Sequence, residues 1–186
     1  MREVPGLRPR VGQEREAVTA PLGNIQAAVR LVHERLIVLS KGMLEGHGSL
    51  VTSVFAVQAK PPDHVLEVIG LRPESRIEKN AMAHLLAQSM RQRPAVDGLV
   101  VIGDAWVSAR LDLWDAPPDE DPGRREALLV LLMAKASDWT EAWQYPYARG
   151  DDGSIAWEPP EGPLIKSART DVALGAFGAF WRITGH

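Results

Sequence analysis

The sequence predicts one α+β domain, in which a mainly antiparallel sheet of about five to six strands packs with two long helices and a short C-terminal helix. Several runs alternate apolar and polar residues, which is typical of strands. Two stretches place apolar residues at steps of three and four, which is typical of helices. At 186 residues, with 45% hydrophobic and 24% charged residues, the chain suits a single globular domain.

Residues 1–18 contain arginines but no apolar signal core, so we expect a flexible N-terminal arm followed by one domain over residues 19–186. A basic arm that touches a partner is the alternative. The net charge of -3 gives no field that would attract nucleic acid or an anionic membrane. No stretch approaches the roughly 18 apolar residues of a membrane span. We therefore expect a cytoplasmic protein without a membrane partner.

The first helix is expected over residues 21–44. Its apolar residues alternate in steps of four and three, as in the a/d seam of a coiled coil: Ile25, Val29, Val32, Leu36, Leu39 and Met43. This seam either packs on the sheet or joins two copies of the chain. A hairpin is expected next, with strands at 50–59 and 64–71 joined by the turn KPPD.

The second helix is expected to begin at a capping box formed by Ser75 and Glu78 and to stop before Pro94. The two central strands follow, within residues 96–114 and 124–136. In the first of them, one alternating set of residues is apolar throughout, and the other set turns polar at Asp104. In the second, residues 127–134 are apolar on both faces, which indicates a strand covered on both sides.

An outer hairpin is expected over residues 137–162, with its turn at Asp151, Asp152 and Gly153. Pro146 favours an edge strand, because proline lacks the backbone donor that a central strand needs. The prolines after it predict a stiff connection. A short helix over residues 172–181 is then expected to end the domain.

The two central strands also carry a resemblance. The triplet Asp104-Ala105-Trp106, a Pro-rich acidic loop, and then Pro122, Arg124 and Glu126 resemble a group of uncharacterised bacterial and phage proteins over roughly residues 51–136. The acid of the triplet is glutamate in that group, so Asp104 is a departure. The resemblance implies a shared fold and a phage or mobile-element setting, and it implies no activity.

The same strands contain the candidate catalytic residues Asp104, Arg124 and Glu126. Carboxylates that are held close together can perform acid–base or metal chemistry. The alternative is a cross-strand ion pair beside a packed tryptophan, which is common on a half-exposed sheet face. Trp106 is expected to be buried against a helix stripe that includes Met82 and Leu85, together with Ile77. Truncating it to alanine would then cost about 3 to 5 kcal/mol.

The candidate binding residues are mainly aromatic: Trp106, Arg110, Trp139, Trp143 and Tyr145. The last three share one strand face with Tyr147 if that strand is regular. Such a row could stack nucleobases, as single-strand binders do. Basic residues are sparse around it, which favours packing in a core or a subunit interface and argues against nucleic acid.

No metal or cofactor is expected. The five histidines lack ligand-pair spacing, no phosphate-binding glycine motif occurs, and the absence of cysteine excludes disulfides and thiolate nucleophiles. The favoured function is a phage or mobile-element accessory protein that forms homo-oligomers or binds an unidentified protein partner. Two alternatives stay open: a hydrolase or nucleic-acid-processing enzyme that uses Asp104, Arg124 and Glu126, and a single-stranded nucleic-acid binder.

Overall fold

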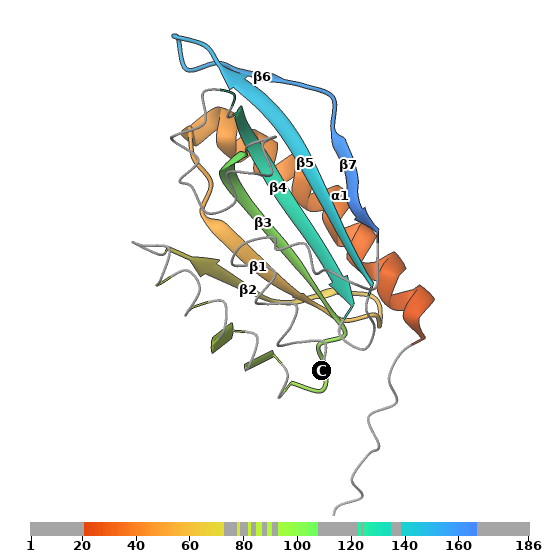
Figure 1. Cartoon of the computed structure of the whole chain (residues 1–186). Coiled ribbons are helices and arrows are strands. Elements are labelled where there is room, and N and C mark those ends of the chain that lie inside the picture. Colours follow the sequence, from red (N-terminus) through yellow and green to blue (C-terminus); the bar gives the residue numbers. More distant parts are fainter. Residues whose placement is uncertain are drawn as a thin grey trace, which may run out of the picture.

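The computed structural model describes residues 21–72, 93–107, 125–134 and 139–166, together with residues 78, 82, 85, 86, 89, 90 and 123. Within this part of the chain, one long helix lies against a sheet of seven strands (Figure 1). The expected N-terminal arm, residues 1–18, and the expected C-terminal helix, residues 172–181, lie outside the described residues.

Helix α1 (Leu22–His47) confirms the first predicted helix and extends it by three residues. It ends at Gly48, whose φ of 72° is a left-handed conformation that glycine adopts without strain. The amide of Gly48 donates to the carbonyl of Leu44 over 2.8 Å and so closes the last turn.

The predicted a/d seam is correct in the first half of α1 and wrong in the second. Its first four residues are buried, but Leu39 and Met43 are 62% and 48% exposed, and the buried line continues instead through Ser40 and Leu44. A straight helix has 3.6 residues per turn, so its buried stripe drifts away from a strict heptad pattern. Leu39 and Met43 therefore turn out of the sheet-facing side.

Strands β1 (Thr52–Val57) and β2 (Val65–Leu71) form the predicted antiparallel hairpin. On its other side, β1 pairs with β3 (Gly98–Val107), which in turn pairs along ten residues with β4 (Arg125–Ala134). The central position of β3 and β4 confirms the prediction from their apolar residues.

Strand β5 (Thr140–Arg149) pairs with β4, and its outer side is shared by β6 (Ile155–Trp157) and β7 (Glu161–Lys166). The sheet order is β2-β1-β3-β4-β5-β6, with β7 also on β5. The carbonyl of Pro146 accepts from the amide of Glu158, so the missing donor of Pro146 faces β6 and β7 and leaves the ladder with β4 intact. The edge-strand prediction from Pro146 is thus wrong, because β5 has neighbours on both sides.

The predicted inventory of elements also needs correction. The described residues form seven strands rather than five to six, because the proline-rich connection after β6 is extended and pairs with β5 as β7. Prolines fit there because one side of β7 needs no ladder donor. The prediction of two long helices and a C-terminal helix is wrong for the described chain, in which α1 is the one continuous helix. Of the expected second helix, only residues 78, 82, 85, 86, 89 and 90 are described, all of them helical.

Each face of the sheet carries its own core. On one face α1 packs on β3, β4 and β5, with buried residues such as Val29, Ile102 and Leu132. The opposite face is covered at β1 and β3 by Leu86 and Met90. Apolar residues on both faces explain why β3 and β4 contain continuous apolar runs.

Candidate functional site

The predicted residues of the central strands lie where the cover by α1 ends. Asp104 and Trp106 point to the α1 face of the sheet, as do the core residues Val100 and Ile102. Trp106 lies directly opposite Glu126 on β4, which lies opposite Tyr147 on β5. The structure therefore brings Asp104, Trp106 and Glu126 together at one end of the sheet. Arg110 and Arg124 lie outside the described residues.

Four of the residues at this end form what we call the sheet-end cluster: Asp104, Glu126, Tyr147 and Arg149. Arg149 Nε donates to both carboxylate oxygens of Glu126, over 2.8 and 3.0 Å. Its Nη2 donates to the Tyr147 hydroxyl over 2.9 Å and lies 3.6 Å from Asp104 Oδ2. The Tyr147 hydroxyl in turn donates to Asp104 Oδ1. One guanidinium thus joins both carboxylates and the phenol.

The electrostatics of the cluster keep Tyr147 protonated. Burial raises the pKa of the Tyr147 hydroxyl well above its ordinary value of 10.0, and the hydrogen bond to Asp104 and the nearby charge of Glu126 raise it further. The Arg149 guanidinium opposes this shift in part. Its hydrogen bonds to Glu126 raise the pKa of Arg149 itself. Tyr147 is therefore a fixed hydrogen-bond donor at neutral pH.

This geometry favours the interpretation of the cluster as a cross-strand ion network. A general base needs an available lone pair within reach of a substrate proton, but both carboxylates are held by Arg149. The described residues also contain no group of three or more His, Asp or Glu side chains that could hold a metal ion. Arg149 was missed as a site residue, although its position two residues after Tyr147 on the same strand face could have indicated it.

A polar seam between α1 and the strands β5 and β6 was not predicted from the sequence. Arg30 Nη2 donates to the buried carboxylate of Glu141 over 2.5 Å. Further along α1, the Lys41 ammonium lies 4.4 Å from the ring centre of Trp157, and Trp157 Nε1 donates to Glu45 over 2.7 Å. Arg30, Lys41 and Glu45 lie eleven and four positions apart, which places them along one side of the helix, so the pattern was available in the sequence.

The aromatic row on β5 belongs to this seam. Tyr145 and Tyr147 are buried, and Trp139 and Trp143 are partly buried. The ring of His33 on α1 lies 5.8 Å from that of Trp143, and the guanidinium of Arg30 lies 5.4 Å from that of Trp139. Because α1 occupies this face, the row is poorly placed to stack nucleobases.

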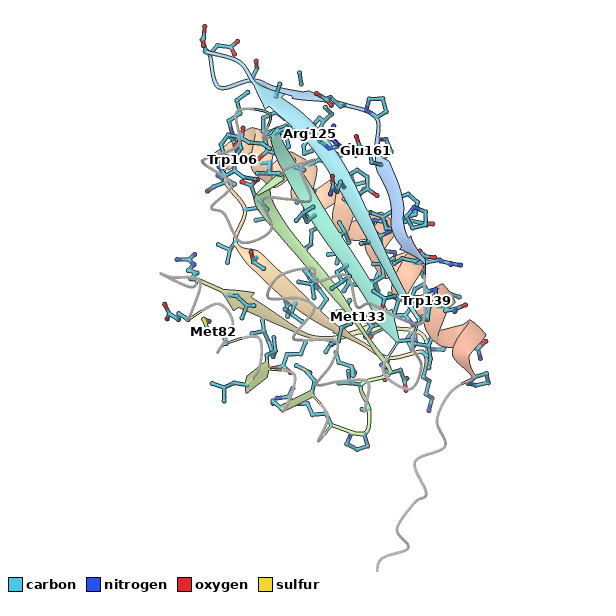
Figure 2. All side chains as sticks on the ribbon, in the orientation of Figure 1. Met82, Trp106, Arg125, Met133, Trp139 and Glu161 are labelled. Carbon is cyan, nitrogen blue, oxygen red and sulfur yellow. The ribbon has the colours of Figure 1, made fainter. Side chains whose placement is uncertain are left out.

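The expected burial of Trp106 is wrong. Trp106 is 49% exposed, and it lies on the α1 face, whereas Met82 packs against the core of the opposite face. Figure 2 shows Trp106 at the far end of β3, well away from Met82 beside β2. Leu85, the other described residue of the expected stripe, is itself 65% exposed. Alternation along β3 decides this outcome, because it places Trp106 on the same side as Asp104.

Exposed apolar side chains gather on two elements. Among the described residues, nine large apolar side chains are exposed, and seven of them belong to α1 or β2. We call the first set the α1 outer stripe and define it as Leu31, Val38, Leu39 and Met43. The second set is Val65, Leu66 and Val68 of β2. Concentration on two elements differs from the scattered single residues of an ordinary surface and is typical of interaction sites.

Comparisons with protein-family models, with curated proteins and with solved structures found no match. No helix within the described ranges is long and apolar enough to cross a membrane.

Proposed function

We propose that the protein is a non-catalytic interaction protein that acts by binding further copies of itself. The observation that carries the proposal is the concentration of exposed apolar side chains on α1 and β2. The ion pairing of Asp104 and Glu126 with Arg149 supports a structural rather than a catalytic role for the central strands.

The α1 outer stripe supports the proposal by its spacing. The stripe consists of Leu31, Val38, Leu39 and Met43, which follow one another at intervals of seven, one and four positions. At 3.6 residues per turn, these intervals place all four on neighbouring sides of one helix. Removing such side chains from water releases about 25 cal/mol for each Å² of apolar surface. Association of two copies through this stripe, or through the exposed set on β2, would supply such burial.

The setting is part of the same proposal. The resemblance around Asp104 and Glu126 implies a phage or mobile-element accessory protein, and we place it in the cytoplasm. The genes that flank the coding sequence test this setting. Neighbouring phage structural or mobile-element genes are expected, and a conserved metabolic operon would contradict it.

Light scattering after size-exclusion chromatography tests self-association. At micromolar concentration the unmodified chain is expected to have a mass of at least twice the 20.4 kDa of one chain. The double substitution Leu39→Glu with Val68→Glu places charge on both exposed surfaces and should lower this mass. Lys60→Glu, in the exposed turn between β1 and β2, is the control and should leave the mass unchanged. A wild-type protein that stays monomeric at all concentrations would contradict the proposal.

A further inference from the structure

The two edges of the sheet are protected to different degrees against pairing with another chain. At one edge, two strands flank β5. Strand β6 has only three residues, and β7 contains Pro163 and the charged residues Glu161 and Lys166. Short strands, prolines and charges are the usual devices that prevent an edge from pairing with another chain. This edge of the sheet therefore resists the addition of a strand from another chain.

The other edge is β2, which has fewer of these devices: one charged residue, Glu67, which pairs with Arg93, and a register irregularity against β1 near Val65. Its seven residues contain no proline and no lysine, and no strand among the described residues pairs with its outer side. Val65, Leu66 and Val68 are exposed, with Val68 at 54%. An open edge with apolar side chains offers both a row of backbone hydrogen-bonding groups and apolar surface to a further strand.

The sequence of β2 complements itself in antiparallel pairing. Val68 is the midpoint of Val65–Leu71, so a two-fold axis through Val68 places the seven residues of one copy along seven of another. The residues nearest the axis, 67–69, belong to the regular part of β2, and its register irregularity against β1 lies near Val65. On the α1 face, Val68 would then lie opposite Val68 of the second copy, and Leu66 opposite Gly70. On the other face, Glu67 would lie opposite Ile69.

Charge favours the same register. An axis through Glu67 would place two glutamates directly opposite each other, and each already has Arg93 of its own chain as its ion-pair partner, so this register brings no new opposite charge to them. The axis through Val68 avoids this placement. It also places Arg72, just after β2, opposite His64 and next to Asp63 of the second copy. Arg72 and Asp63 are both exposed, so opposite charges would meet at each end of the joint.

We propose that two copies of the chain join through antiparallel pairing of β2 with β2, centred on Val68, so that their sheets form one continuous sheet. This inference rests on the proposed function, since it names the surface through which the copies associate. It assigns the contact to the β2 edge and not to the α1 outer stripe.

Cysteine cross-linking tests the register directly, because the natural chain has no cysteine. Directly opposed residues of antiparallel strands have Cα atoms about 4.5 to 5.5 Å apart, within the roughly 4.4 to 6.8 Å that a disulfide spans. Val68→Cys in the full chain should therefore form a disulfide-linked dimer under mild oxidation. Gly70→Cys, on the same strand face but opposite Leu66, and Val38→Cys, on the α1 outer stripe, are the matched controls and should stay unlinked.

The outcomes separate this inference from the proposed function. A linked dimer of Val68→Cys alone, with circular dichroism and mass before oxidation like those of the wild type, supports the β2 joint. If Val38→Cys or Gly70→Cys cross-links and Val68→Cys does not, the joint or its register is overturned while self-association stands. If the wild type and all three variants are monomers, both the joint and the proposed function are overturned.

Discussion

The imidazole Nε2 of His33 on α1 and the hydroxyl of Tyr145 on β5 lie 2.9 Å apart and share a buried hydrogen bond. Burial lowers the pKa of His33 below its ordinary value of 6.5, although the charges of Glu141 and Glu34 raise it in part. His33 is thus held neutral between the helix and the sheet. The bond couples the polar seam to the titration of one side chain.

His33 should make stability depend on pH. The folded state has the lower pKa, so the unfolded state binds the proton first, and stability is lost as the pH falls through the unfolded-state value of 6.5. Urea unfolding of the wild type should therefore show a loss of stability between about pH 7.5 and about pH 5.5. His33→Gln removes the titrating group and should show a smaller loss. Equal losses in the two proteins would mean that His33 is not held neutral by burial.

The two tyrosines of the chain should resist ionisation in the folded protein. Tyr145 and Tyr147 are the only tyrosines, and burial raises the pKa of both above 10.0. Absorbance of phenolate should thus stay low in the native protein as the pH passes about 10 and should appear there in urea. Because the folded state has the higher pKa, stability is lost as the pH rises above the unfolded value. A native titration that matches the one in urea would contradict the burial of both hydroxyls.

Trp106→Ala should have a modest effect on stability. About half of the side chain is in water, so truncation should raise or lower the free energy of unfolding by no more than about 1.5 kcal/mol. Leu132→Ala, at a fully buried position of β4, is the comparison and should cost about 2 to 5 kcal/mol. Urea unfolding of the two variants checks this order. A larger loss for Trp106→Ala than for Leu132→Ala would show that Trp106 is a core residue after all.

Gly98 lies at a close approach of α1 to the sheet. A Cβ atom there would lie 2.7 Å from the carbonyl oxygen of Met133 and 2.7 Å from Val29 Cγ2. Gly98→Ala should therefore destabilise the protein by about 1 to 3 kcal/mol through overpacking. Gly70→Ala, whose new atom would meet Val51 Cγ1 at 3.5 Å, is the matched control and should change stability little. Thermal unfolding compares them, and equal melting temperatures would contradict the close approach.

Local patterns predicted much of the fold. The alternation in β3, the doubly apolar run in β4 and the turn of the β1–β2 hairpin each depend on neighbours in sequence, and each prediction was confirmed. The predictions that were wrong concern features that depend on contacts between residues far apart in the sequence. The pairing of β7 with β5 was not predicted. The prolines of this segment are compatible both with a connection and with a strand that pairs on one side only. The Arg125–Glu161 ion pair, at 2.6 Å, holds that strand and joins residues 36 positions apart (Figure 2).

At the candidate site, too, local patterns predicted which residues share a face but not their contacts with distant residues. Strand alternation placed Asp104 and Trp106 on one face and predicted that cover would end at Asp104, as the structure shows. It could not say which helix covers that face, so Trp106 was assigned to the wrong core. The pairing of Asp104 and Glu126 with Arg149 also depends on register between three strands, which no local pattern specifies.

The mass of the unmodified chain in solution, measured by light scattering across a dilution series, tests the central claim most directly. Association through an exposed surface predicts a mass of at least twice 20.4 kDa at high concentration, falling toward 20.4 kDa on dilution. A mass of 20.4 kDa at every concentration up to about 100 μM, well above the Kd of a specific complex of ordinary strength, would contradict it.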